Sequence, residues 1–365
     1  MTNYNDPLVL YNMASVIYGG TVAANWQIDT YGVTGALGSV IDGNVTFKEA
    51  SITWSLDGPG SAEIDLVEDD TGSKWLSGRR RVKLSRNGTA MHVGYLNNVS
   101  AQSQGYPHMT TYRCSLLGWA SILDFRVVHG DFSQNSVVGT TIAWNLINHT
   151  NAQEDTGITS GAVVGTATSF TRHYCDGDII GEEIQNLSER DTGGFDWEVD
   201  ATGAFKAWVG GRGTNKTGSI TLTLNPRLDW TEEAETSDVV TYVTAMGEDP
   251  DGPCGPPLSV QTIALSGYPR REVVVDAERF SQTELVDAAN DEIKARQRAR
   301  VRVQTTMHVN DLPWAVGTGG VWLGDTINVA TNAAFGGTQV MRCIEVTVSL
   351  ERGASEWWTY TFEAV

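Results

Sequence analysis

Basic residues gather in two short stretches, and these are the residues with the clearest potential to bind another surface. The stretches, 79–86 and 294–302, lie at the start of one expected strand and at the junction of an expected helix and strand. The arginines that we single out in them are Arg79, Arg80, Arg81, Arg298, Arg300 and Arg302. Positive charge protects strand edges from mispairing and favours helix C-termini, which would make both clusters solvated edges. An equally open interpretation is contact with acidic surface on a neighbouring subunit. All six are therefore candidate inter-subunit contacts.

Two adjacent tryptophans near the end of the sequence are a second candidate contact. Trp357 and Trp358 lie in an expected strand, where neighbouring side chains point to opposite faces. We therefore expect one indole ring to be buried and the other to be available for docking, and both are candidate inter-subunit contacts.

The sequence contains no concentrated catalytic or cofactor motif. Its six histidines are scattered, and neither an HExxH run nor a GxSxG run occurs. The glycine-rich runs lack the Lys-Ser/Thr ending of a phosphate-binding loop. We therefore predict no catalytic residue, no cofactor and no bound metal, and we expect that the protein is not an enzyme.

Cysteines and acidic runs offer only weak ligand sets. Cys114, Cys175, Cys254 and Cys343 are far apart and form no CxxC pair, which favours reduced, structural thiols. The carboxylate runs at 68–70 and 248–252 contain oxygen ligands that Ca²⁺ prefers, but neither has EF-hand spacing. Solvated turns are the favoured interpretation, and Ca²⁺ binding stays open.

Composition narrows the function classes. The chain has 365 residues, 44 acidic against 25 basic, and a formal net charge of −19. This balance argues against an extended phosphate-binding surface, because affinity for DNA backbones comes mainly from Lys and Arg. An apolar share of 41% predicts folded domains with real cores rather than a disordered or fibrous chain. The first residues lack a signal peptide, and no run has the length of a membrane span, so we expect synthesis in a cytoplasm.

Alternation of apolar and polar residues predicts the strands that position these side chains. Ile52, Trp54 and Leu56 share one face of a strand that ends at a glycine- and proline-rich turn. Asn87-Gly88 between two alternating runs predicts a β-hairpin. Further strands are expected at 195–199, 204–208, 239–247, 301–309, 322–330, 339–350 and 357–363.

Three segments have helical spacing instead. The first runs from 136 to 148, and the second from 179 to 190 with Asp178 as its expected N-cap. The third runs from about 281 to 299, with Leu285, Ala289 and Ile293 on its inner stripe. The predicted fold class is mainly β with an α+β insertion. We expect a first β-barrel domain at 1–130, the α+β insertion at 131–215, and a second β-barrel domain with one helix at 216–365.

In this layout several segments resemble the tail hub proteins of long-tailed bacteriophages. The similar segments are 51–63, 116–119, 238–247 and 324–329, and the likeness extends over nearly the whole chain. The same family is similar to the hub part of type VI secretion spikes. Minor tail, baseplate hub and tail-associated proteins belong to it.

This resemblance implies a structural protein of the virion tail tip with two barrel-like hub domains in each chain. It implies a homotrimer that joins the tail tube or distal tail ring to tip or fibre proteins and lines the channel for genome ejection. The implied partners are the distal tail protein, the tail tube or tape-measure protein, and tip or fibre proteins. DNA would pass without specific binding, and we expect an acidic channel lining to repel its phosphates.

Two alternatives stay open from the sequence. The first is a hexameric distal tail protein, which differs from the hub in having six rather than three copies per ring. The second is a cell-wall or carbohydrate-active tail enzyme, which is suggested by 12 tryptophans and abundant carboxylates. The absence of a concentrated acid–base motif makes the enzyme the weaker alternative.

Overall fold

The computed structural model describes residues 24–31, 47–56, 58–67, 81–104, 109–166, 168–189, 194–223, 229–235, 239–246, 259–262, 270–276, 282–297, 300–316, 320–332, 337–351 and 356–365. The statements below concern these residues. The sequence-predicted contacts Arg79, Arg80 and Arg298, the acidic runs at 68–70 and 248–252, and Cys254 lie outside them.

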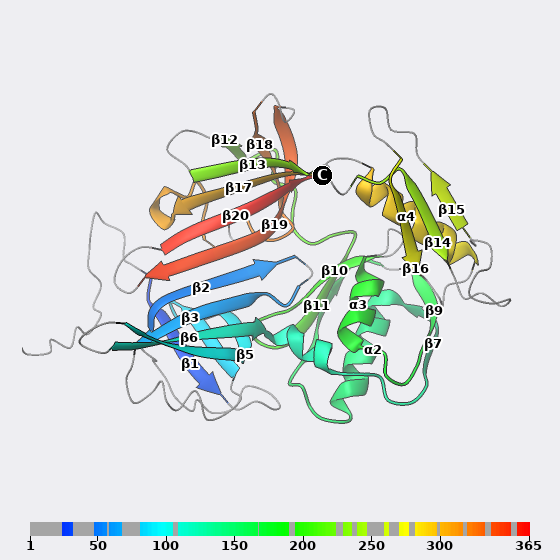
Figure 1. Cartoon of the computed structure of the whole chain (residues 1–365), viewed down its shortest axis with the longest axis horizontal. Coiled ribbons are helices and arrows are strands. Elements are labelled where there is room, and N and C mark those ends of the chain that lie inside the picture. Colours follow the sequence, from blue (N-terminus) through cyan, green and yellow to red (C-terminus); the bar gives the residue numbers. More distant parts are fainter. Residues whose placement is uncertain are drawn as a thin grey trace, which may run out of the picture.

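The largest element is a 12-stranded sheet that both ends of the chain build together (Figure 1). The N-terminal part contributes β1 (Trp26–Tyr31), β2 (Phe47–Ser55), β3 (Ser61–Val67), β4 (Arg81–Arg86), β5 (Thr89–Gln104) and β6 (Met109–Gly118). The C-terminal part contributes β12 (Thr221–Thr223), β13 (Asp229–Glu235), β17 (Arg300–His308), β18 (Thr326–Ala330), β19 (Thr338–Glu351) and β20 (Glu356–Ala364). The order is β1-β4-β5-β6-β3-β2-β19-β20-β17-β13, with β18 and β12 branching from β19. The two parts therefore meet at the antiparallel β2–β19 pair.

Alternation along the strands explains how the sheet acquires a buried face. In β20 the side chains of Trp358, Tyr360 and Phe362 are buried, whereas Trp357 and Thr359 point to the other face. The predicted turn at Asn87-Gly88 joins β4 and β5, and its two residues have φ angles of 51° and 80°. Positive φ at both positions is the geometry that such two-residue hairpins require, so this prediction is confirmed.

Each half of the sheet is barrel-like, and the two halves share one hydrophobic core. Between the halves, the Trp26 indole of β1 donates a hydrogen bond to Glu356 at the start of β20. In the second half, the Asn332 amide after β18 donates a hydrogen bond to Glu232 of β13 at 2.9 Å. The strand pairings among the described residues form an open path, so side-chain contacts complete the curvature.

In sequence, an α+β insertion separates these two halves. It begins with a 3-10 helix, η1 (Trp119–Phe125), and contains β7 (Phe132–Val138), α2 (Gly139–Asn151), β8 (Thr159–Val164), β9 (Ser169–Tyr174), α3 (Ile180–Ser188), β10 (Phe195–Val199) and β11 (Ala204–Val209). One small sheet has the order β10-β11-β8, and β7 pairs with β9. Residues of α2, α3, β10 and β11 share a second core.

The predicted helices of the insertion are present with shifted boundaries. Residues 136–138, predicted as helix, belong to β7, and α2 extends instead to Asn151. The predicted N-cap Asp178 is wrong, because Ile179 occupies that position with no side-chain cap. Asp178 instead accepts a hydrogen bond from the Cys175 amide at 2.7 Å and closes the preceding turn.

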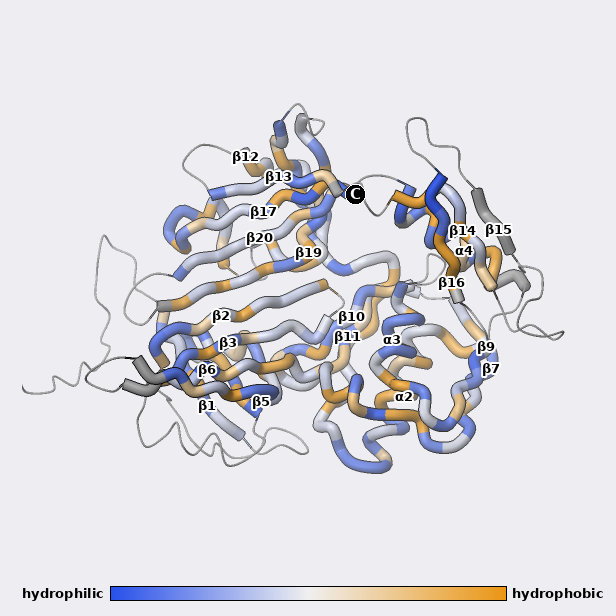
Figure 2. The backbone as a smooth tube through the Cα atoms, in the orientation of Figure 1, coloured by the Kyte–Doolittle hydropathy of each residue, from blue (hydrophilic) through white to orange (hydrophobic). Residues whose placement is uncertain are grey.

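A third, smaller unit contains β14 (Tyr242–Met246), β15 (Ser259–Thr262), β16 (Glu272–Asp276) and α4 (Gln282–Arg296). The predicted inner stripe of Leu285, Ala289 and Ile293 is buried against this sheet. In Figure 2, β16 changes from hydrophilic at its start to hydrophobic along its length. The short helix η2 (Val309–Asp311) follows β17.

The fold is mainly β with an α+β insertion, as the sequence predicts. The domain boundaries at 130 and 215 stay predictions. No helix in the described part of the chain is long and apolar enough to cross a membrane.

Candidate functional site: a sheet face and a polar joint

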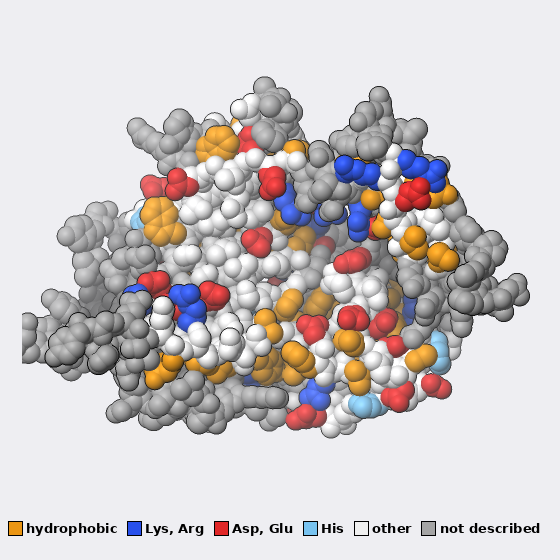
Figure 3. All heavy atoms as spheres, viewed as in Figure 1, with side chains coloured by type: hydrophobic (Ala, Val, Ile, Leu, Met, Phe, Trp, Pro, Cys, Tyr) orange, Lys and Arg blue, Asp and Glu red, His pale blue; other side chains and the backbone are white. Residues whose placement is uncertain are grey.

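The face of the large sheet that points away from the core carries hydroxyl groups. We call it the hydroxyl face, and its outward hydroxyl and amide side chains on β2, β17, β19 and β20 are Ser51, Thr53, Ser55, Gln304, Thr306, Thr347, Ser349, Thr359 and Thr361. Thr53 and Thr347 form a hydrogen bond of 2.9 Å across the β2–β19 pair, and Thr306 and Thr359 form one of 2.8 Å across β17–β20. Figure 3 shows a broad surface with few charged side chains over these strands.

Charges on this face are few and partly paired. Arg302 forms an ion pair with Glu363 at 2.9 Å, and Glu345 lies beside Thr361 with 3.4 Å between their oxygens. The face therefore offers hydrogen-bonding groups without a strong field of either sign.

The predicted contact residues lie in different environments. The Arg81 side chain is fully buried with its guanidinium 5.0 Å from the centre of the Trp119 ring, and burial lowers its pKa. Trp358 is also fully buried, while Trp357 is 41% exposed and its ring lies 5.2 Å from that of His308. Contact with another subunit requires an accessible side chain, so Arg81 and Trp358 serve the core of this chain.

Arg300, Arg302 and Trp357 remain accessible and lie on the paired strands β17 and β20. Arg302 is already paired with Glu363, and Arg300 lies opposite Glu235 of β13. As contacts between subunits they stay a prediction.

Glu356 is a buried carboxylate at the meeting point of the two halves, and it is not among the residues that the sequence singles out. It accepts hydrogen bonds from Arg86 at 2.9 Å, Trp358 at 2.7 Å and Trp26 at 3.3 Å. These three donors, of which the Arg86 guanidinium also forms an ion pair, offset the cost of burying the charge. The only signal for Glu356 in the sequence is its position, as an acidic residue directly before a strand rich in aromatic residues.

A second set of polar contacts joins the insertion to the C-terminal strands, and we call it the polar joint. The Asp325 carboxylate is 4% exposed and accepts hydrogen bonds from the Thr214 amide at 2.8 Å, the Lys216 ammonium at 2.7 Å and the Trp322 amide at 2.9 Å. Asp325 directly follows Gly324, and its partners Thr214 and Lys216 are more than 100 residues away in sequence.

The other half of the polar joint is centred on Asp196 of β10. Its carboxylate accepts hydrogen bonds from the Arg212 amide and from the Arg342 guanidinium of β19. The Arg212 guanidinium forms an ion pair with Glu198 at 2.7 Å and lies over the Trp208 ring. Side-chain charges therefore hold the insertion against the large sheet.

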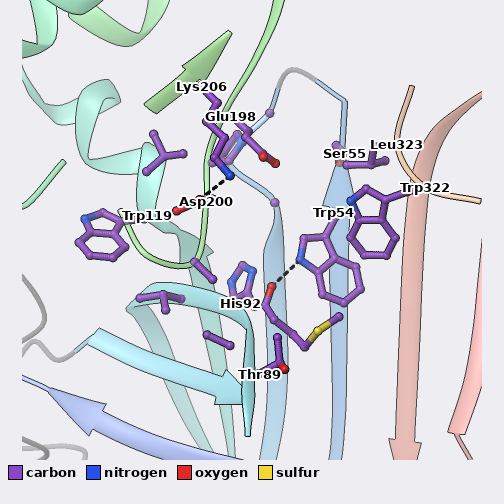
Figure 4. A pocket seen from close by; sticks show the side chains of 18 of the residues that line it. Trp54, Ser55, Thr89, His92, Trp119, Glu198, Asp200, Lys206, Trp322 and Leu323 are labelled. Atoms are coloured by element: carbon purple, nitrogen blue, oxygen red, sulfur yellow. Dashed lines mark hydrogen bonds and ion pairs between the residues drawn. The ribbon is translucent and has the colours of Figure 1, made fainter. Parts of the chain in front are cut away.

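Beside the polar joint lies a cleft of about 450 Å³ (Figure 4). It is lined by the N-terminal half of the large sheet, by the insertion and by the C-terminal half. Trp54 and Trp322 form one wall, with ring centres 5.2 Å apart, and the Asp200–Lys206 ion pair lies on another wall. His92 lies between them, and its ring is 4% exposed. Burial lowers the pKa of His92 to about 4.

His92 lacks the contacts of a catalytic acid or base. The Nε2 atom of His92 has no hydrogen-bond partner among the described residues, whereas a catalytic histidine is oriented by one group and contacts another. No group of three potential metal ligands occurs in the described ranges. The described cysteines Cys114, Cys175 and Cys343 are free, and burial raises the pKa of Cys114 to about 11, which keeps it protonated and unreactive.

Comparison with solved structures identifies the same fold in tail proteins. The 43 kDa tail protein of prophage MuSo2 from Shewanella oneidensis has a TM-score of 0.63 and 14% identity, with 93% of this chain and 98% of that chain covered. The tail protein from Neisseria meningitidis MC58 has a TM-score of 0.64 and 13% identity, with 93% and 96% covered.

The fold also occurs in a secretion system. The E. coli c3393 protein, a component of the type VI secretion system with structural similarity to the T4 tail proteins gp27 and gp5, has a TM-score of 0.50 and 15% identity, with 88% and 74% covered. No family model and no curated protein sequence matches the chain. The predicted resemblance to tail hub proteins is thus confirmed at the level of the fold.

Proposed function

We propose that this chain is a structural hub protein of a phage tail tip that assembles as a ring of three copies. The observation that carries the proposal is the continuous sheet that both ends of the chain form, with its hydroxyl face that carries few charges. The shared fold with prophage tail proteins supports the assignment to a tail. The chemistry of the cleft supports a structural rather than an enzymatic role, because burial favours the neutral form of His92 and its Nε2 atom has no hydrogen-bond partner among the described residues.

In this proposal the hydroxyl face lines the channel through which DNA passes. Hydroxyl groups can exchange hydrogen bonds with water beside a moving polyanion. The two arginines on this side of β17 lie beside acidic residues, since Arg302 is paired with Glu363 and Arg300 lies opposite Glu235, so the lining would provide little counterion release to bind phosphates. The expectation from net charge was an acidic lining. The face proposed here carries few carboxylates, Glu345 among them, so weak attraction rather than strong repulsion would let DNA pass.

The partners that fit such a hub are the distal tail protein or tail tube on one side and tip or fibre proteins on the other. Two related halves per chain would let three copies match a sixfold tube. The location that follows is the tail tip of the virion.

Quantitative mass spectrometry of purified tails tests this function. We expect the chain in every tail at three copies, measured against the tape-measure protein as an internal standard. Six copies would favour the distal tail protein instead, and absence from tails would refute both. Deletion of the gene should give particles without infectivity, which expression of the wild-type chain restores.

A further inference from the structure

The edge strand β8 of the insertion is exposed and has an unpaired edge among the described residues. It pairs in parallel with β11 and forms the end of the β10-β11-β8 sheet, and no element in the described part of the chain pairs with its other edge. Five of its six residues are exposed. An unpaired edge presents backbone N–H and C=O groups that can accept a further strand.

Both faces of β8 are apolar near its end. Val163 is 50% exposed and Val164 is 53% exposed, and their registers place them beside Ala207 and Trp208 of β11. Ala207 belongs to the buried core of the insertion, so Val163 continues that core to the rim of the sheet. A strand added here would bury apolar surface on both faces.

Charge is missing from this edge. No charged residue occurs between Asp155 and Arg172, although charged residues make up 19% of the chain. The edge strand β13 shows the contrast, because Asp229, Glu232, Glu233 and Glu235 are acidic. Natural proteins protect exposed edges with charge, proline or bulges, so an exposed apolar edge without charge indicates a surface that is covered in the assembly.

We propose that an extended, uncharged segment of another tail protein adds to the free edge of β8 as the fourth strand of the β10-β11-β8 sheet. Main-chain hydrogen bonds would supply affinity, and the valines on opposite faces would select small or apolar neighbours. The proposal rests on the proposed function for the choice of partner. Pairing of β8 with β8 of a second copy would join two chains about a two-fold axis, and such contacts do not build a ring of three.

The test compares two variants in phage particles that carry the gene in place of the wild type. The double variant V163K/V164K places a charge on each face of β8, and both positions are accessible enough to keep the fold. The matched control is Val274→Lys, because Val274 is 60% exposed on β16, another edge strand. As isolated proteins, the double variant and the wild type should melt at the same temperature. Phage particles with the double variant should lose infectivity, and particles with the control variant should keep infectivity.

Hydrogen exchange of the β8 amides supplies the direct readout. In the isolated wild-type chain these amides should exchange rapidly, and in intact tails their exchange should slow by about tenfold or more. Equal exchange in both states, or full infectivity of V163K/V164K, would overturn the proposal. Wild-type chain absent from tails would instead refute the proposed function itself.

Sedimentation of the isolated chain identifies the occupant. The wild type and V163K/V164K should sediment alike, because the partner is a different protein. A wild-type association that the double variant abolishes would make a second copy the occupant and would also overturn the proposal.

Discussion

The β2–β19 seam and the polar joint connect parts of the chain that are distant in sequence, but they use different interactions. At the seam, backbone hydrogen bonds continue the sheet and a shared apolar core lies beneath it. At the polar joint, the carboxylates of Asp196 and Asp325 hold the insertion through charged side chains. The seam should therefore resist changes of pH and salt, whereas the joint depends on single charges and is the place where the insertion can be loosened.

The largest expected effect comes from the core under the seam. Trp358→Ala removes a fully buried ring that stacks on Trp54 and donates to Glu356, so we expect a loss of about 4 kcal/mol in the free energy of unfolding. Urea unfolding measures it. The control Trp357→Ala, on the exposed neighbour, should cost less than about 1 kcal/mol. Equal losses would mean that the seam does not depend on its core.

The next effect should separate the joint from the seam. Asp325→Ala leaves the Lys216 ammonium and two backbone amides without their acceptor, and we expect a loss of about 3 kcal/mol. Hydrogen exchange should become faster in 214–216 and 322–326, while the amides of β2 and β19 keep their protection. Faster exchange across the seam as well would show that the two connections form one cooperative unit.

A pH titration probes the cleft between the two connections. His92 has a pKa of about 4 in the folded chain and about 6.5 when unfolded, so the unfolded chain binds more protons between these values. Its contribution to stability is complete above pH 6.5 and is lost as the pH falls towards 4, by about 3 kcal/mol. The difference between wild type and His92→Gln in urea midpoints at each pH isolates this contribution. A pH-independent difference would contradict it.

The smallest effect concerns the hydroxyl face. Thr53→Val removes one partner of the 2.9 Å hydrogen bond with Thr347, and we expect a cost of about 1 kcal/mol or less because both groups are half-exposed. The double variant T53V/T347V should cost no more than the single one. A large loss in the double variant would show that the hydroxyls stabilise the seam rather than serve its surface.

Local patterns in the sequence predict much of this fold. Asn87-Gly88 fixes a hairpin through the backbone freedom of two residues, and the spacing of Leu285, Ala289 and Ile293 identifies the buried stripe of α4. Such features depend on neighbours in sequence, so a single chain reveals them.

The connections between the parts of the fold depend on residues that are far apart in sequence. No local pattern specifies that Thr53 faces Thr347, or that Asp325 accepts from Lys216. Arg81 is a second example. Its basic neighbours in sequence indicate an exposed cluster, but the Trp119 ring and the surrounding core bury it. Burial of a charge is a property of the assembled structure, and a charged residue is usually exposed.

The most direct test of the hub assignment is a cryo-electron microscopy reconstruction of the tail tip at side-chain resolution. We predict three copies in a ring, with Thr53, Thr347 and Thr359 facing the channel. A ring of six copies, or three copies with the hydroxyl face turned away from the channel, would contradict this account.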